Sequence, residues 1–312
     1  MLGLRSRSVA ALTSPPIVSM PTRALAASAD LTTQLRASTL RGSVVVVVYA
    51  AVNIGLLLSW DIVGSHQADW TLWEGIGTSL TSGTLYTADG LPYLWSPLLA
   101  PVMALVGIVG LVPWAVVHVA TLALLRDWRL IGLLLVSLGF WTNVVGGNTF
   151  TFVVVAAILA LRGSRGWAMV YLALLFLMPR PVQVPIGLLL LWRMPEIRLP
   201  TLAVFVAHAA AVLATGYADD WLQVMVSLGV PVWSVGPSYW LGLSWLVIGV
   251  PLGLVLLWRG HPGWAGLAWT SYWLPHYFLI PMTEDRRSLV PLTAVVLLGA
   301  ISASIVWATR GG

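Results

Sequence analysis

Apolar residues follow one another in runs that are long enough to cross a lipid bilayer. The first run, residues 43–60, reads SVVVVVYAAVNIGLLLSW and is followed directly by Asp61. A bilayer core is about 30 Å thick and needs roughly 20 helical residues, so a slightly tilted helix of this length can span it. Hydrophobic residues make up 59% of the chain and the mean hydropathy is +0.90, far above soluble domains. The sequence therefore predicts an all-α membrane protein with several spans, because helices satisfy their own backbone hydrogen bonds in lipid.

Further apolar segments divide the rest of the chain, giving about ten spans in all. Residues 95–125 are too long for one straight span and contain three prolines, so we expect a bent helix or two short ones. Several later segments are nearer a dozen residues than a full crossing, and we expect them to tilt, pack inside the bundle or stop partway across. The segments after residue 125 are 130–141, 150–161, 167–178, 182–192, 199–215, 239–258, 264–281 and 289–308.

Arginines and acids are distributed unevenly between the resulting loops. Arginine is enriched in the cytoplasmic loops of membrane proteins, so most arginine-bearing loops, including those with Arg162 and Arg259, are placed inside. We therefore expect a mobile cytoplasmic tail at 1–42, a membrane domain at 43–308 with an extracytoplasmic loop at 61–94, and a cytoplasmic C-terminus at 309–312. The charged residues assigned to the outside are Arg180, Arg286, Arg287, Asp61, Asp69, Glu74, Asp89, Asp219, Asp220, Glu284 and Asp285.

Composition excludes several classes of function. The chain has no cysteine, which excludes disulfides, thiolate nucleophiles and Cys-ligated metals. The net charge is +5, but the arginines are scattered and form no stripe, so we expect no nucleic-acid partner. All sixteen basic residues are arginine, a usage typical of a GC-rich bacterial genome. No third carboxylate or histidine lies near Asp219 and Asp220 in sequence, and we expect no obligatory metal and no cofactor.

The extracytoplasmic loop 61–94 contains a helical pattern of its own. Its apolar spacing predicts an amphipathic helix that lies in the membrane interface with its tryptophans at headgroup level. Asp69 would stand at the start of this helix, where it is either an N-cap or a functional carboxylate. Glu74 lies inside the helix, and we expect its side chain on the solvent-exposed face. The residues at helical spacing are Trp70, Trp73, Ile76 and Leu80.

Three blocks form a pattern in chain order within residues 43–308. The first contains Asp69, Trp70, Trp73, Gly83, Tyr86, Tyr93, Ser96 and Pro97. The second begins at GGNTF and has a turn, an apolar span, a short basic turn and a second span, then Arg180 before Pro181. The third, YWLPHYFLIP, places His276 and Tyr277 in a late span. Together these blocks resemble glycosyltransferase family 87, also called DUF2029, of the C-type superfamily of polytopic enzymes. The chain is shorter than typical members and reads GGNTF where they often carry a glutamine and an asparagine.

The resemblance implies a C-type bundle and an activity. The chain would be a hexosyltransferase, working in the bilayer of a bacterial plasma membrane, that moves a sugar from a polyprenyl-phosphate donor to an extracytoplasmic lipid or glycan acceptor. The family analogy suggests mannose. By this resemblance, Asp69 would be the general base that takes a proton from the acceptor hydroxyl. The lipid-phosphate leaving group needs positive charge, and the phosphate-binding candidates are Arg180, Arg286 and Arg287. The substrate-cavity candidates are His276, Tyr277, Asn148, Glu74 and Tyr93.

Structural roles remain open for the same residues. Arg180 could pair with an outer acid or with helix-terminal carbonyls, and Arg286 and Arg287 could join a surface ion-pair cluster. Asn148, like Asn143, could cap a short helix instead of facing the sugar. For the whole chain, the alternatives are a transporter or flippase of an amphipathic solute and a non-catalytic family member. Within the spans, the residues expected to bond a neighbouring backbone carbonyl are His118 and His208.

Overall fold

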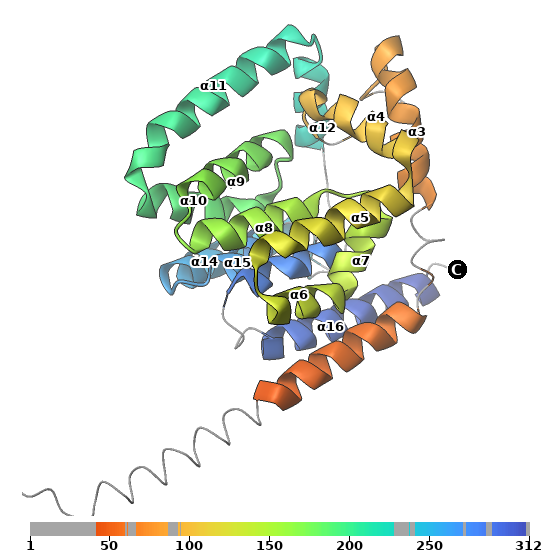
Figure 1. Cartoon of the computed structure of the whole chain (residues 1–312), viewed down its shortest axis with the longest axis vertical. Coiled ribbons are helices and arrows are strands. Elements are labelled where there is room, and N and C mark those ends of the chain that lie inside the picture. The colour runs from red at the N-terminus through yellow and green to blue at the C-terminus, as the bar shows by residue number, and fades with distance from the viewer. Residues whose placement is uncertain are drawn as a thin grey trace, which may run out of the picture. The chain divides into compact units, whose positions relative to one another are not determined.

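The chain divides into two units, Met1–Val44 and Val45–Gly312, and the second is described below. The computed structural model describes residues 42–59, 61, 67–86, 93, 95–227, 237, 241–270, 273–284 and 289–309 (Figure 1), with only the backbone at 67–69, 226–227, 302–303 and 306–309. Throughout these ranges the chain forms helices and turns and no strand, which confirms the all-α prediction. The predicted tail at 1–42 lies outside the described residues apart from Gly42, and so does the predicted C-terminus apart from Thr309.

Two helices in the described ranges are long and apolar enough to cross a membrane. They are Gly42–Ser59 and Pro195–Ala214. Two bent pairs could each add a span: Pro97–Val109 with Leu111–Leu125, and Trp128–Leu135 with Leu138–Val145. The described part of the chain therefore has two candidate spans, or up to four, and the prediction of about ten spans is not confirmed.

The predicted break within residues 95–125 is confirmed. The segment forms η1 (Pro97–Leu99), α4 (Ala100–Val109), α5 (Leu111–Leu122) and η2 (Ala123–Leu125). Its two halves are bent by 117°. The bend lies at Gly110, whose φ of +77° is a conformation that glycine adopts without steric cost. The three prolines stand near the starts of η1, α4 and α5, where a missing backbone N–H costs no intrahelical bond.

Helix α8 (Phe150–Leu161) lies at the centre of the second unit and coincides with the segment predicted there. Nine of its twelve residues are buried, as expected for a helix that is apolar on every side. It packs against α5 and α9 (Figure 1). The other helices from residue 128 onward are α6 (Trp128–Leu135), α7 (Leu138–Val145), α9 (Arg165–Leu177), η3 (Pro181–Gln183), α10 (Val184–Arg193), η4 (Pro195–Ile197), α11 (Arg198–Ala214), α12 (Ala218–Ser227), η5 (Gly242–Ser244), α14 (Trp245–Trp258), α15 (Pro262–Trp269), η6 (Pro275–Thr283) and α16 (Leu289–Thr309).

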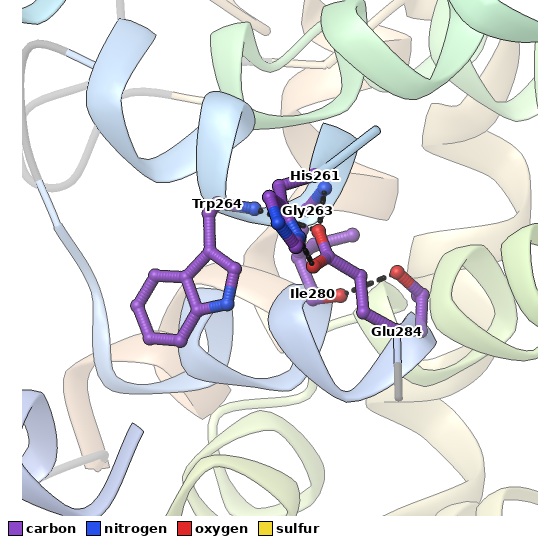
Figure 2. Close-up of polar contacts among 6 residues, drawn as sticks. His261, Gly263, Trp264, Ile280 and Glu284 are labelled. Carbon is purple, nitrogen blue, oxygen red and sulfur yellow. Dashed lines mark hydrogen bonds and ion pairs between the residues drawn. The ribbon is translucent and has the colours of Figure 1, made fainter. Parts of the chain in front are cut away.

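The prediction of one span over residues 264–281 is wrong. Helix α15 ends after eight residues, and the 3-10 helix η6 packs back against it. The close approach depends on Gly263, where a Cβ atom would lie 2.7 Å from the carbonyl oxygen of Ile280. Glu284 then closes the reversal (Figure 2): its carboxylate accepts the backbone N–H of Gly263 at 2.7 Å and that of Trp264 at 3.2 Å. The start of α15 and the end of η6 therefore lie together.

This reversal also contradicts the assignment of Glu284 and Arg162 to opposite sides of the membrane. The carboxylate lies 2.9 Å from His261 Nδ1, two residues after Arg259. It also lines a pocket of about 270 Å³ together with Asp127 and Arg162. The sequence placed Glu284 outside and both Arg162 and Arg259 inside. The structure instead brings Glu284 to the same end of the unit as Arg162.

Candidate functional site

Arg180 is a buried cation in the turn between α9 and α10. It precedes Pro181 and has extended dihedral angles (φ −133°, ψ 130°), because a proline disfavours helical angles in the residue before it. Only 6% of its surface is exposed. Its Nη2 donates to Asn148 Oδ1 at 3.2 Å, whereas its buried Nη1 has no acceptor within the described ranges. Among the aspartates and glutamates whose side chains the structure describes, none forms an ion pair with it.

Three aromatic rings surround the guanidinium group. The Arg180 Cζ atom lies 5.2 Å from the ring centroid of Phe150, 5.5 Å from that of Trp95 and 5.7 Å from that of Tyr277. All three distances fall within the range of cation–π attraction. We call Arg180, Trp95, Asn148, Phe150 and Tyr277 the arginine cage.

The arginine cage leaves part of the electrostatic cost of burial uncompensated. A cation–π contact contributes about 0.5–2 kcal/mol, whereas removing a charge from water costs several kcal/mol. One hydrogen bond to Asn148 uses one of the five N–H donors of a guanidinium. An oxyanion would supply both opposite charge and acceptor oxygens, and the planar fork of arginine suits phosphate and carboxylate. The arrangement can therefore bind an anion.

The turn that carries Asn148 is fixed by two tryptophans of α3 (Gln67–Ser82). The indole N–H of Trp73 donates to Gly146 O at 3.0 Å, and that of Trp70 donates to Val145 O. These carbonyls end α7 and have no acceptor role left inside that helix. Gly147, with φ +63°, lies so close that a Cβ atom would be 2.1 Å from Trp73 Nε1. The turn therefore holds Asn148 against Arg180.

Asn143 takes the capping role that the sequence left open. Its side chain is fully buried, and its Oδ1 accepts the backbone N–H of Phe150 at 2.9 Å, at the start of α8. Its Nδ2 donates to Thr151 Oγ1 at 2.8 Å and lies 3.3 Å from His118 Nδ1. His118 thus bonds a side chain, whereas the sequence predicted a backbone carbonyl. His208 likewise lies 3.0 Å from the hydroxyl of Ser96.

Helix α3 confirms the helix predicted in the loop 61–94, but the Trp73 ring packs inside the protein, whereas the prediction had it exposed to lipid headgroups. Trp73 is 5% exposed and its ring stacks on Trp95 with 4.9 Å between centroids. A Cβ atom at Gly107 of α4 would lie 2.4 Å from Trp73 O, so the two helices are in close contact. The burial follows from these contacts with α4, α7 and Trp95, which replace the expected membrane interface.

Asp69 is the third residue of α3. Four residues of helix, about 6 Å along the axis, separate its backbone from that of Trp73. The described part of Asp69 is its backbone alone, so its role as a general base remains a prediction. Glu74 is exposed on the same helix, in agreement with a solvated face.

The other predicted site residues fall into three groups. His276 and Tyr277 are buried at the arginine cage, where the His276 ring centroid lies 5.4 Å from that of Phe150. Tyr93 is buried beside Trp95 and donates its hydroxyl to Ser96 O at 3.1 Å. Burial raises the pKa of Tyr93 well above its usual value, so this hydroxyl stays protonated. The third group, Arg286 and Arg287, lies outside the described residues.

Glu284, which precedes those two arginines, lies far from the arginine cage. Phe150 contributes its ring to the cage from the first turn of α8, while Leu161 at the other end of this helix lines the pocket with Glu284. A helix of twelve residues is about 18 Å long. The cage and the Glu284 contacts therefore occupy opposite ends of α8.

Three residues were missed by sequence reasoning: Trp95 and Phe150 of the arginine cage, and Gln183 next to it. Phe150 follows the GGNT turn at the start of an apolar segment, where an aromatic residue gives no sign of a functional role. Trp95 lies between two residues of the family-like pattern, Tyr93 and Ser96, and gave no further signal. Gln183 had one: it is a polar residue within an apolar segment three positions after Arg180, where polar groups are expensive unless they serve a function. No protein-family model, curated protein or solved structure matches the chain.

Proposed function

We propose that this chain is a multi-pass glycosyltransferase of a bacterial plasma membrane. It moves a sugar, mannose by family resemblance, from a polyprenyl phosphate to an extracytoplasmic lipid or glycan acceptor. The observation that carries the proposal is the buried Arg180, which has an aromatic surround, one hydrogen bond and a free Nη1 donor. A site with these properties suits the phosphate group of the donor.

In the proposed reaction the acceptor hydroxyl oxygen attacks the anomeric carbon of the sugar. Asp69 takes the proton from this hydroxyl as the new bond forms. The bond between the anomeric carbon and the phosphate oxygen breaks, and its electron pair leaves with polyprenyl phosphate. Negative charge grows on that phosphate, so Arg180 stabilises the transition state more than the ground state.

The contacts of α3 support a joint role for Asp69 and Arg180. The helix that carries Asp69 also carries Trp70 and Trp73, whose indole N–H groups donate to backbone carbonyls at the end of α7. Trp73 also stacks on Trp95 of the arginine cage. A base that acts on the acceptor and a cation that acts on the donor phosphate must lie on either side of one anomeric carbon. A common structural support for both residues fits this requirement.

The proposal is tested with purified full-length protein, labelled polyprenyl-phosphate-mannose and a bacterial lipid extract. We expect the wild type to move label into new glycolipids. Asp69→Asn should abolish transfer while leaving donor binding intact, and Arg180→Met should lower transfer by about 100-fold or more, the scale for loss of a preorganised donor in an acyl-transfer site. Arg165→Met is the matched control, because Arg165 forms a surface pair with Glu196 and its side chain is 73% exposed.

Three outcomes would contradict the proposal. The first is full transfer by Arg180→Met. The second is a wild type that neither binds the donor nor transfers its sugar. The third is label that crosses a sealed vesicle while remaining on the donor, which would instead support the flippase alternative.

A further inference from the structure

Gln183 lies beside the arginine cage with one of its polar atoms unused. Its side chain is fully buried, and its Nε2 donates to Met178 O at 3.2 Å. This bond sets the orientation of the amide, because the reversed orientation would place Oε1 against the same carbonyl oxygen. Oε1 is therefore a buried acceptor that has no donor among the described residues.

Gln183 and Arg180 belong to one turn. The backbone N–H of Gln183 donates to Arg180 O at 3.0 Å, so the Cα atoms of the two residues lie within about 7 Å. Met178, which accepts from Gln183, also accepts from the hydroxyl of Thr149. Thr149 directly follows Asn148, which accepts from Arg180. Hydrogen bonds and chain neighbours thus link the two residues within one small cluster.

The two unused groups differ in their chemistry. Nη1 of Arg180 needs an acceptor and favours an anionic one, while Oε1 of Gln183 needs a donor. They do not bond each other, since each is without a partner in the part of the chain that is described. Near neutral pH a bare phosphate group offers mainly acceptor oxygens. A glycosyl phosphate offers both acceptor oxygens and sugar hydroxyl donors.

We infer that Gln183 accepts a hydrogen bond from a hydroxyl group of the donor sugar while Arg180 holds the adjacent phosphate. Gln183 then distinguishes polyprenyl-phosphate-sugar from the bare polyprenyl phosphate that leaves after transfer. This discrimination favours product release, because the product lacks the group that would satisfy Oε1. The inference rests on the proposed function.

The test measures the affinity of full-length protein in detergent for two ligands, polyprenyl-phosphate-mannose and polyprenyl phosphate. Gln183→Met keeps a side chain of similar length and removes the acceptor. It should weaken binding of the mannose-bearing ligand by about tenfold, equivalent to about 1.4 kcal/mol, and leave binding of polyprenyl phosphate within about twofold. Gln223→Met, at an exposed glutamine of α12, is the matched control and should change neither affinity.

Arg180→Met separates the inference from the proposed function. If it weakens both ligands while Gln183→Met weakens only the mannose-bearing one, both claims are supported. If Arg180→Met weakens both ligands and Gln183→Met weakens neither or both equally, the inference is overturned and the proposed function stands. A folded Arg180→Met that binds both ligands as the wild type does would overturn the proposed function itself. A thermal melt of each variant identifies any that has failed to fold.

Discussion

The indole ring of Trp73 stacks on that of Trp95, with 4.9 Å between the ring centroids and 17° between the planes. Trp95 in turn lies 5.5 Å from the guanidinium carbon of Arg180. Trp73 also donates to Gly146 O, two residues before Asn148. Helix α3 is therefore joined to the arginine cage through both the aromatic stack and the turn that holds Asn148.

Replacement of Trp73 by alanine should affect both stability and donor binding. The substitution empties a buried site and removes the stack and the hydrogen bond, so we expect a loss of about 3–5 kcal/mol in the free energy of unfolding. Donor affinity should fall as well, because Trp95 and Asn148 lose a support. Chemical unfolding in detergent and donor titration measure the two effects. Trp192→Ala is the control, since Trp192 is 80% exposed; equal effects of the two substitutions would contradict the packing described here.

Glu284→Ala should destabilise the reversal between α15 and η6. The carboxylate is 7% exposed and accepts two backbone N–H groups at the start of α15, as an N-terminal cap does. Loss of such a cap costs about 0.5–2 kcal/mol. Glu196→Ala provides the comparison, because Glu196 pairs with Arg165 at the surface and exposed pairs contribute about 0–1 kcal/mol. If unfolding showed no greater loss for Glu284 than for Glu196, the capping role would be excluded.

Tyr86 should make stability fall in alkaline solution. Burial, and secondarily Tyr217 and Asp220, raise the pKa of Tyr86 well above its usual value. Its hydroxyl donates to Trp95 O at 2.7 Å only while it is protonated. In the unfolded chain a tyrosine ionises near pH 10, so stabilisation is complete below that pH and is lost as the pH rises above it.

The measurement for Tyr86 is the free energy of unfolding of the wild type and Tyr86→Phe between pH 8 and pH 11, a range chosen around the usual tyrosine pKa of about 10. The variant should be less stable at the lower end, since Trp95 O loses its donor, and should lose less stability than the wild type at the upper end. Parallel curves for the two proteins would show that Tyr86 does not contribute to the pH dependence.

The reversal at η6 also predicts which side of the membrane each loop faces. The chain has no cysteine, so single cysteines can be placed at Arg165, Arg259, Thr283 and Thr84 without background labelling. A membrane-impermeant maleimide applied to one side of oriented vesicles should label the first three together and Thr84 from the opposite side. Labelling of Thr283 with Thr84 would instead support a continuous span over residues 264–281.

Local sequence patterns predicted the parts of the fold that depend on local chemistry. Helix α8 has the predicted bounds because its residues are apolar on every side and a polar turn follows at Arg162. The bend between α4 and α5 was expected from length and proline content. The reversal of η6 was not, since it depends on contacts of Glu284 and Ile280 with Gly263, residues that are far apart in the chain.

The site was predicted in the same uneven way. Arg180 was predicted as a site residue because a charged side chain between short apolar segments is costly unless it has a function. Asn148, His276 and Tyr277 lie beside it or beside its aromatic neighbours. Trp95 could not be selected, because nothing in its sequence surroundings indicates that its ring faces a residue 85 positions away. These side chains come together only through the packing of segments that are distant in the chain, among them α3, α8 and η6.

The slight exposure of Arg180, 6% of its surface, also bears on ionic strength. Dissolved counterions screen charges that they can approach, while buried charges are screened much less. An anion that reaches this guanidinium must leave most of its hydration shell behind, and dissolved salt competes with it only weakly. Affinity at the arginine cage should therefore change little between dilute buffer and physiological salt, unlike the attraction of an anionic ligand to the scattered surface arginines.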